Sequence, residues 1–320
     1  MSSKATKFKS TLLHPRYWLT WFAFGLWWLI TLLPFPLLLR LGKAIGLIFY
    51  AIPSRRKIIA RRNIEICFPA LGAAEQKAML RANFISTGIA VMEVGIAWWW
   101  PKKRFSKLVQ FEGLENLEAV KGRGVMVLGI HYTTLEVGAA ALSSQWQMDG
   151  MYRAHGNPVY DFLQARGRLQ QSIGDNAVFE RRDVRGTMKA LKQGHSLWYG
   201  PDQDYGLGQG LFAPFFGVQA ATVYATARFA EKTGAAVVPF SHVRLPGSEG
   251  YKVTVYPALE DFPSGDDLVD ATRINQLIEK FVQLQPEQYL WVHRRFKNRP
   301  EGEADLYNLP AKKKRRRRAN

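Results

Sequence analysis

Residues 124–130 read Gly-Val-Met-Val-Leu-Gly-Ile, and the next six read His131-Tyr132-Thr133-Thr134-Leu135-Glu136. The first run is short, apolar and bounded by glycine, which is typical of a strand buried on both faces of a sheet. A threonine then supplies a helix N-cap, and the pattern predicts a helix over residues 135–146. Ligands of open α/β sheets bind beyond the carboxyl ends of strands, so His131 stands where a site is expected.

His131 and Glu136 form a candidate catalytic dyad. Residues five apart lie roughly 140° apart on a regular helix, so these side chains can meet only across a strand-to-helix turn. Thr133 and Glu136 also fit a capping box, in which the glutamate merely satisfies a backbone N–H. Capping does not explain a histidine at a strand end, where it can take a proton from a hydroxyl, but these residues alone leave both interpretations open.

The rest of the chain alternates between strand and helix patterns. Strands are predicted at 124–130, 148–153, 195–200, 235–242 and 251–257, and helices at 75–100, 135–146, 158–170, 184–193, 219–233 and 268–285. Alternation of this kind predicts an α/β fold with a mostly parallel sheet flanked by helices. There is no internal repeat and no glycine-rich phosphate loop.

The charge balance is strongly basic. The 320 residues include 44 lysines and arginines against 26 acidic residues, a net charge of +18, and Lys312 to Arg318 contribute seven of these positive charges. Such a balance indicates an anionic partner, which could be nucleic acid, anionic lipid or an acidic protein. The single cysteine, Cys67, excludes an intramolecular disulfide and is predicted to lie in the core. The sequence contains no cluster of cysteine and histidine with zinc spacing, so no metal is expected.

The N-terminal region predicts membrane attachment. Residues 17–33 carry no charge and are rich in tryptophan, and as a helix they would be about 25 Å long, just short of the hydrocarbon thickness. Pro34 and Pro36 interrupt the pattern, and an amphipathic run with Arg40 and Lys43 follows. We expect one inserted segment and one helix in the membrane interface, although a buried pair of soluble helices remains an alternative.

Three regions follow from these patterns. We expect a membrane segment and interfacial helix over residues 1–52, an α/β domain over 53–310 and a disordered polybasic tail over 311–320. More basic residues follow the apolar segment than precede it, so the positive-inside rule places the α/β domain in the cytoplasm. Whether the segment spans the membrane or enters it from one side is left open. The tail is either a second anchor on anionic lipid or a passive solubilising segment.

An ordered set of motifs resembles the late acyltransferases of lipid A assembly, within the wider H-x4-D/E acyltransferase superfamily. The matching stretches are His14 to Trp21, Asn63 to Pro69, residues 129–138, Tyr152-Arg153, Trp198 to Gly206 and His293 to Gly302. The dyad alone is modestly specific, whereas the ordered set is highly specific. The tail at Lys312 to Arg318 is no part of the family pattern.

The resemblance implies a glycerolipid acyltransferase-like fold and transfer of an acyl chain, expected to be lauroyl. The donor would be acyl carrier protein, the acceptor a 3-hydroxyacyl chain of Kdo-bearing lipid IVA, and the location the inner leaflet of the bacterial inner membrane. The donor is a substrate, so no cofactor is expected. The partners implied are the carrier protein, the lipid A precursor and an anionic lipid surface, with no nucleic acid.

The resemblance also suggests roles for individual residues. His131 would take the proton of the acceptor hydroxyl, Glu136 would orient the imidazole, and Arg153 would stabilise the oxyanion. Acceptor binding is expected from acidic and basic side chains in two later motifs and a basic pair, namely Asp202, Asp204, Arg181, Arg182, His293, Arg294, Arg295 and Lys297. Phe215 and Phe216 are expected to line the acyl path.

Two other functions are kept in view. A phospholipid acyltransferase acting on a lysophosphatidate-like acceptor is the nearer one, but the Pro-Glu-Gly-Thr-Arg loop of those enzymes is replaced here by Pro201 to Gly206. A membrane-tethered nucleic-acid-binding protein would explain the charge and the tail. No RNA-recognition, KH or zinc-finger pattern supports that second function.

Overall fold

The computed structural model describes residues 7–309, apart from 153, 175, 177 and 181–182. Its strands are β1 (Val109–Glu112), β2 (Val125–Leu128), β3 (Gly150–Tyr152), β4 (Val178–Glu180), β5 (Ser196–Tyr199), β6 (Gly210–Phe215), β7 (Val218–Val223), β8 (Ala236–Arg244) and β9 (Tyr251–Val255). Its α-helices are α1 (Trp18–Thr31), α2 (Phe35–Ala51), α3 (Arg55–Cys67), α4 (Ala73–Trp99), α5 (Lys102–Phe105), α6 (Glu115–Glu118), α7 (Leu135–Ser143), α8 (Pro158–Leu169), α9 (Val184–Lys192), α10 (Ala225–Thr233) and α11 (Asp267–Leu284).

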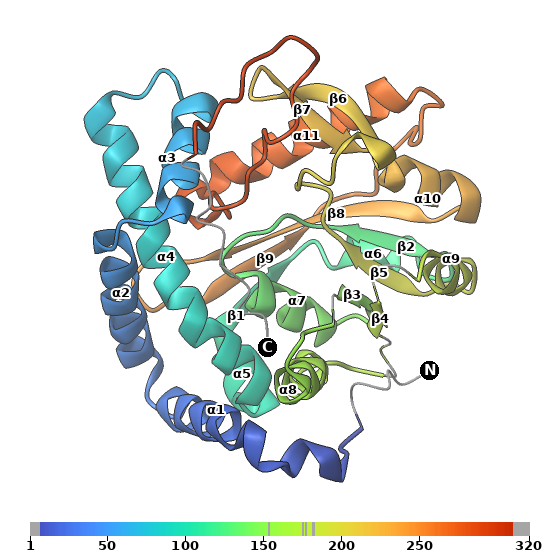
Figure 1. Ribbon diagram of the computed structural model, residues 1–320. Helices are drawn as coiled ribbons and strands as arrows, with labels where there is room; N and C mark the ends of the chain where they lie inside the picture. The colour runs from blue at the N-terminus through green and yellow to red at the C-terminus, as the bar shows by residue number, and fades with distance from the viewer. Residues whose placement is uncertain (1–6, 153, 175, 177, 181–182, 310–320) are drawn as a thin grey trace, which may run out of the picture.

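A five-stranded sheet with the order β1-β9-β8-β2-β5 forms the centre of the molecule (Figure 1). Strand β2 is parallel to both of its neighbours, β5 and β8, and β1 is parallel to β9. Only β8 and β9 pair antiparallel within this sheet. The predicted α/β fold with a mostly parallel sheet is therefore confirmed.

Alternate residues of β2 enter two separate hydrophobic cores, one on each face of the sheet. Met126 and Leu128 belong to the core shared with α3, α10 and α11, whereas Val125 and Val127 belong to the core shared with α2 and α7. All four side chains are fully buried. Burial of one such side chain contributes roughly 1.5–3 kcal/mol, so both faces of β2 hold helices against the sheet.

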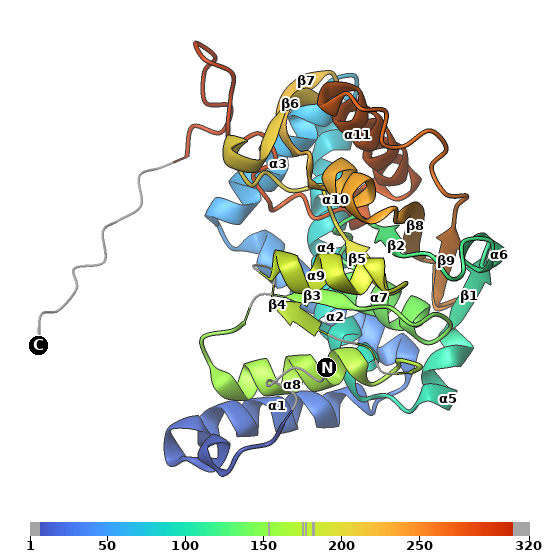
Figure 2. The same ribbon diagram turned by 90° about the vertical axis from the view of Figure 1, so that its right-hand side faces the viewer.

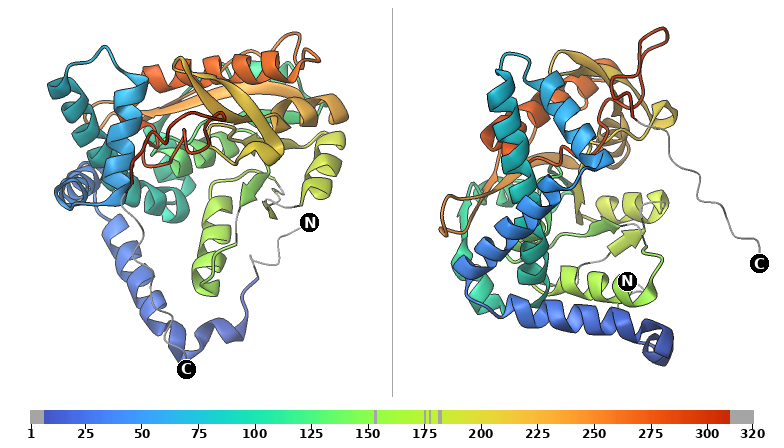
Figure 3. Two further views of the ribbon diagram at one scale, coloured as in Figure 1. Left: turned by 45° about the horizontal axis from the view of Figure 1, so that its top comes forward. Right: turned by 60° about the vertical axis from the view of Figure 1, so that its left-hand side comes forward.

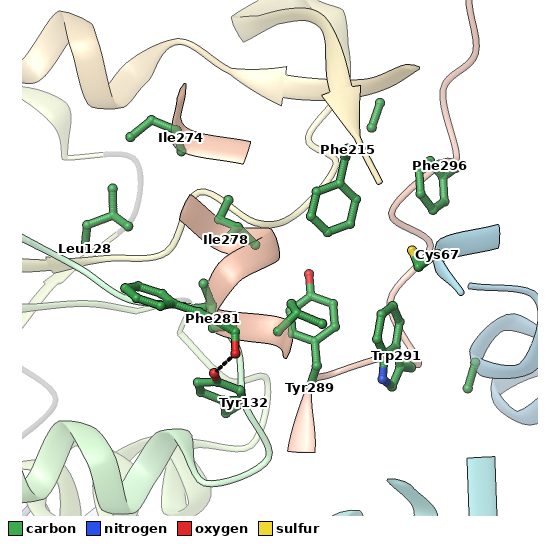
Figure 4. Close-up of a cluster of buried hydrophobic side chains, with 14 of the residues drawn as sticks. Cys67, Leu128, Tyr132, Phe215, Ile274, Ile278, Phe281, Tyr289, Trp291 and Phe296 are labelled. Carbon is green, nitrogen blue, oxygen red and sulfur yellow. Dashed lines mark hydrogen bonds between the residues drawn. The ribbon is translucent and has the colours of Figure 1, made fainter. Parts of the chain in front are cut away.

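Figure 4 shows part of the first core, where residues of α11 lie beside Leu128 and the C-terminal segment. Tyr132 directly follows His131, the candidate catalytic histidine. Its hydroxyl donates a hydrogen bond to the carbonyl oxygen of Phe281. Cys67 is buried in the same cluster, as expected, and burial raises the pKa of its thiol well above the usual value. A buried thiol with a raised pKa is a poor nucleophile.

The prediction of one helix over residues 219–233 was wrong. Residues 218–223 form β7, which pairs antiparallel with β6 from Phe215↔Val218 to Gly210↔Val223, and the helix begins only at Ala225. The turn between the strands is Phe216-Gly217, and both residues have positive φ, 49° and 74°. A two-residue turn with both φ values positive is the usual connection of a tight hairpin, and its glycine was the signal that the helical interpretation missed.

The N-terminal helices wrap around one side of the α/β layers, with α1 along the outer side of α8 (Figures 2 and 3). Trp27 of α1 donates a hydrogen bond to the carbonyl oxygen of Val91 in α4, at 3.1 Å, and Phe24 is buried. With 14 residues, α1 is about 21 Å long. By length and composition, α4 could cross a bilayer, although half of its most apolar 18-residue stretch is buried inside the fold. Helices α2 and α3 could also do so if together they formed one span, which would be bent by 93°.

Candidate active site

His131 lies just beyond the carboxyl end of β2, in a loop held by backbone hydrogen bonds. Its carbonyl oxygen accepts from the N–H of Leu290 at 2.9 Å, and the N–H of Thr133 donates to the carbonyl oxygen of Gln288 at 2.7 Å. Tyr132 and Tyr289 form an isolated antiparallel bridge between the same two segments. The C-terminal segment therefore fixes the backbone on which His131 is carried.

Asp202 fixes the imidazole of His131 from two directions. One carboxylate oxygen lies 2.6 Å from Nδ1 of the ring, and the other accepts the backbone N–H of His131 at 3.0 Å. Burial disfavours the charged carboxylate, but the attraction of His131 and these hydrogen bonds outweigh it, so the pKa of Asp202 lies below its usual value. With Nδ1 bound to a carboxylate, Nε2 is the nitrogen left to accept a proton.

Gly200, two residues before Asp202, allows this approach. A Cβ atom at position 200 would lie 2.8 Å from Cε1 of His131 and 2.7 Å from the Trp198 ring. The Trp198 ring packs edge-on against the imidazole, with 5.4 Å between centroids. The loop after β5 can thus place a carboxylate on His131 only because residue 200 has no side chain.

The predicted hydrogen bond between Glu136 and His131 was wrong. Glu136 lies in the first turn of α7, and its carboxylate accepts from Nη2 of Arg168 in α8 at 2.5 Å and from Nε1 of Trp98 in α4 at 2.8 Å. The capping box is not formed either, since the Thr133 hydroxyl pairs with Ser86 at 2.6 Å. The helix directs residue 136 toward its neighbouring helices, whereas Nδ1 of His131 faces the loop after β5.

Glu136 and Arg168 form a largely buried ion pair, with side chains 15% and 31% exposed. Burial would raise the pKa of the carboxyl, but the Arg168 charge and the hydrogen bonds from Arg168 and Trp98 hold it below its usual value. Burial alone would lower the pKa of the Arg168 guanidinium, but the charge of Glu136 and its hydrogen bonds outweigh burial and raise that pKa. Both groups are therefore charged at neutral pH, and the pair fixes the direction of the guanidinium.

A cavity of about 330 Å³ lies beside these groups, between α7, α8, β3 and β5. Its polar wall includes His131, Glu136 and Arg168. Its apolar wall consists of helix and strand side chains and includes Trp98, Leu135, Ala139, Ala140, Met148, Met151, Leu169 and Trp198. The site thus combines a histidine whose Nε2 has no hydrogen-bond partner among the described residues, a fixed guanidinium and an apolar chamber.

The other acidic and basic candidates occupy different places. Asp204 accepts from the backbone and side-chain amides of Asn298, at 2.8 and 2.5 Å, and its own N–H donates to Nε2 of His293 at 3.1 Å. Burial lowers the pKa of His293 to about 4. Arg294 is half-buried and Lys297 is exposed. Asp204 and His293 therefore join two loops, while Arg294 and Lys297 are accessible to a ligand.

Arg295, expected to bind the acceptor, is buried in the core instead. Its guanidinium donates to the carbonyl oxygen of Ala221 at 2.6 Å and to Thr222 and Asn275, both at 3.1 Å. Only 2% of the residue is exposed. Those hydrogen bonds join the β6–β7 hairpin to α11, so Arg295 cannot reach a ligand in this structure.

The two phenylalanines expected in the acyl path do not line the cavity beside His131. Phe215 is fully buried against Phe296 and the Arg295 guanidinium, as Figure 4 shows for the two rings. Phe216 packs on Phe68, with 5.2 Å between ring centroids. Alternation along β6 turns Phe215 into the core, which the sequence motif alone does not reveal.

Three candidate residues, Arg153, Arg181 and Arg182, lie outside the described residues, as does the tail at 312–318. Among the residues that are described, no group of three histidine, cysteine, aspartate or glutamate side chains is arranged to hold a metal ion. The absence of a cofactor remains a prediction.

Two residues of the site were not expected from the sequence. Arg168 and Trp98 stand in helices that were predicted, but nothing local distinguishes them from other residues of those helices. Asp202 was singled out by its motif, but it was expected to bind the acceptor rather than His131. Only the packing of α4, α7 and α8, and of the loop after β5, brings these groups together.

Comparison with known proteins identifies a protein family for this chain. The family described as "Bacterial lipid A biosynthesis acyltransferase" matches residues 5–298. The chain is 41% identical to the lipid A biosynthesis lauroyltransferase and 43% identical to the lipid A biosynthesis palmitoleoyltransferase of Escherichia coli, each over 94% of this chain and 98% of the relative. The 1-acyl-sn-glycerophosphate acyltransferase structure from Thermotoga maritima matches at 13% identity and a TM-score of 0.35, over 72% of this chain and 97% of that one.

Proposed function

The chain belongs to the bacterial lipid A biosynthesis acyltransferase family, and we propose that it transfers a fatty acyl chain from acyl carrier protein to a hydroxyl of Kdo-bearing lipid IVA. It is an acyltransferase, and the lipid A precursor is its substrate class. The observation that carries the finer proposal is the His131–Asp202 pair, which opens on a cavity with an apolar wall. The relatives at 41% and 43% identity are named for lauroyl and palmitoleoyl chains.

His131 is proposed as the general base. A hydroxyl loses its proton as it attacks, because its pKa is far above neutral, and Nε2 of His131 takes that proton while a C–O bond forms to the thioester carbonyl. Asp202 stabilises the imidazolium that results and keeps the proton-accepting nitrogen toward the substrate. When the C–S bond breaks, the imidazolium returns the proton to the sulfur of the carrier, so no covalent acyl-enzyme is required.

Arg168 is proposed to stabilise the oxyanion that forms on the attacked carbonyl oxygen. Its guanidinium lines the cavity together with His131, and Glu136 fixes its direction through hydrogen bonds at 2.5 and 3.1 Å. A fixed donor aimed at developing charge contributes about 3–4 kcal/mol in comparable sites. Glu136 thus acts through Arg168 as a positioning residue. Arg153, suggested earlier for this role, lies outside the described residues.

The apolar wall of the cavity is proposed to hold the acyl chain. Small residues Ala139 and Ala140 leave room along α7, and Met148 and Leu169 supply apolar surface opposite them. Burial of one methylene contributes about 0.8 kcal/mol, so a chain that fills the cavity is favoured over a shorter one. Phe215 and Phe216 are replaced in this role by residues of α7, α8 and β3.

Attachment to one leaflet of the membrane is proposed, with the active site on the cytoplasmic side. Helix α1 is about 21 Å long, shorter than the roughly 30 Å hydrocarbon layer, and its inner face packs on the fold through Phe24 and Trp27. Its other face exposes large apolar side chains, which are Trp18, Leu19, Phe22, Leu26, Trp28 and Leu29. A helix with one face packed on protein and one apolar face exposed fits insertion into a single leaflet.

Acyl transfer can be tested directly with purified protein in detergent. Labelled lauroyl or palmitoleoyl carrier protein is offered with Kdo-bearing lipid IVA, and the product is analysed by mass spectrometry. We expect the acceptor to gain one acyl chain in ester linkage. Product on lysophosphatidate, with none on lipid IVA at either donor length, would overturn the proposal and favour a phospholipid acyltransferase. Binding of generic DNA tighter than binding of carrier protein would favour the nucleic-acid alternative.

A further inference from the structure

A second cavity, of about 600 Å³, lies beside α2. It is bounded by α2, by Ile89 of α4, by the turn after β8 and by the segment at residues 285–288. None of its lining residues also lines the active-site cavity. It is therefore a separate cavity with its own chemistry.

Two basic side chains in this cavity have no ion-pair partner among the described residues. Arg40 and Lys43 are exposed, and their spacing of three residues places them side by side on the surface of α2. Arg244, the third cation of the lining, is already neutralised by Glu93 of α4, through contacts of 2.6 and 2.9 Å. With Glu287 as the one carboxylate in the lining, the cavity keeps one net positive charge.

The surface beside the cavity is apolar. Helix α2 packs its glycine face against α4, where Gly42 and Gly46 leave no room for a Cβ atom. The face turned away from α4 exposes Leu37, Leu41 and Ile48. A helix that exposes an apolar face and carries basic residues beside it is the pattern of a membrane-interface helix. The two cations then stand at the depth of the lipid headgroups.

We propose that this cavity binds the phosphodiester headgroup of an anionic phospholipid of the surrounding bilayer, a lipid that is neither donor nor acceptor. One net positive charge matches the single negative charge of a phosphodiester, and Arg40 and Lys43 supply the donors. Ser248 and Gln285 add polar groups at the rim. The inference rests on the proposed attachment to one leaflet, which places α2 in the interface.

The bound headgroup would lie close to the backbone that carries His131. Gln288 lines the cavity, its side chain exchanges hydrogen bonds with the backbone of Arg244 at 2.8 and 2.9 Å, and its carbonyl oxygen accepts from Thr133. A lipid in the cavity therefore contacts the segment that holds the catalytic loop.

Lipid binding by the full chain in neutral detergent tests the inference without donor or acceptor. Retention of labelled phosphatidylglycerol is measured against phosphatidylcholine, for the wild type and for the double variant Arg40→Gln/Lys43→Gln. The matched control Lys103→Gln/Lys107→Gln removes two exposed cations elsewhere. We expect the wild type and the control to prefer phosphatidylglycerol, and the Arg40/Lys43 variant to bind it about tenfold more weakly.

A third variant separates a built site from diffuse surface charge. Ser248→Trp fills the cavity and leaves every charge in place, so the site predicts loss of phosphatidylglycerol preference. Unchanged binding by this variant, or equal binding by the two double variants, overturns the inference. The inference would also be overturned if inorganic phosphate displaced the labelled lipid at the same concentration as unlabelled phosphatidylglycerol does, because the ligand would then be free phosphate. Displacement of the labelled lipid by lipid IVA at a lower concentration than by phosphatidylglycerol would overturn it as well, since the site would then belong to the acceptor.

The outcome is independent of acyl transfer. Wild-type protein that transfers acyl chains but shows no preference for phosphatidylglycerol would refute the headgroup site alone. Preference for phosphatidylglycerol in protein that transfers nothing would support the site and count only against the proposed reaction.

Discussion

Two histidine–aspartate pairs stand at opposite ends of the same parallel strands. Nδ1 of His131 lies 2.6 Å from Asp202 beyond the carboxyl end of β2, and Nδ1 of His195 lies 2.8 Å from Asp149 just before the start of β5. Both aspartates are 1% exposed, while the histidines are 17% and 37% exposed. His131 lines the active-site cavity; His195 does not, although its partner Asp149 does.

The difference between them shows that position, more than pairing, makes a histidine a candidate base. Both rings have a buried carboxylate on Nδ1 and therefore a similar tautomer. Only His131 also stands where helix starts and strand ends converge, beside Arg168 and an apolar chamber. Substitutions in and around the two pairs test this contrast.

Replacement of the two histidines should separate activity from pairing. We expect His131→Ala to lower kcat by about 10³-fold, because the proton acceptor is lost. His195→Ala should change kcat less than about threefold, since the ring lies outside the cavity. Steady-state transfer of labelled acyl groups measures both. Equal losses in the two variants would mean that the pair at His131 has no special role.

Asp202→Asn should lower kcat by about 10²-fold or more, because an amide cannot stabilise the imidazolium and permits the wrong tautomer. KM should change little, since Asp202 is buried and bonded to His131. The matched change Asp266→Asn, at the N-cap of α11, should leave kcat unchanged. A rise in KM with kcat intact would instead assign Asp202 to acceptor binding, the role suggested by its motif.

Arg168→Met should lower kcat by about 10²-fold and also destabilise the protein, because Glu136 is left buried without its partner. Combining it with Glu136→Gln removes the unpaired charge. The double variant should recover most of the thermal stability and none of the activity. Recovery of activity along with stability would show that the pair is structural only.

A third histidine, His242, has no carboxylate hydrogen-bonded to it in the part of the chain that the structure describes; its Nδ1 contacts the Thr134 hydroxyl at 3.0 Å. Burial, with His131 adding to it, lowers the pKa of His242 to about 3. The unfolded chain takes up this proton near pH 6.5, so stability is complete above about pH 6.5 and falls by up to about 1.4 kcal/mol per unit down to about pH 3. Denaturant unfolding between about pH 6 and 4 should show a shallower slope for His242→Gln than for the wild type.

The smallest effect is expected at the second pair. His195→Gln should cost less than about 1 kcal/mol of unfolding free energy at neutral pH, because a ring that is more than a third exposed is well screened by solvent. Urea denaturation measures it, with the wild type as reference. A cost above about 3 kcal/mol would show that the pair at the start of β5 is essential to the fold.

Most strands and helices could be predicted because their signals are local. The apolar run at 124–130 and the helical pattern at 158–170 contain their own evidence, and the structure has β2 and α8 there. The prediction of a helix over residues 219–233 was wrong because residues 218–223 include too few polar side chains to distinguish a strand from a helix. The hairpin that forms there depends on pairing with β6, which is not visible in the local sequence. The edge strand β1 has only four residues, too few for a periodic signal.

The fold class, the family and the position of His131 at a strand end could be predicted from the sequence, since these depend on local patterns and ordered motifs. The partner of each side chain was decided by tertiary structure. His131 pairs with a residue 71 positions away and Glu136 with one 32 positions away, in place of each other. The reason is geometric: the strand end sets the direction of the imidazole and the first turn of α7 sets that of the carboxylate. Only the packing of distant helices and loops determines what each one meets.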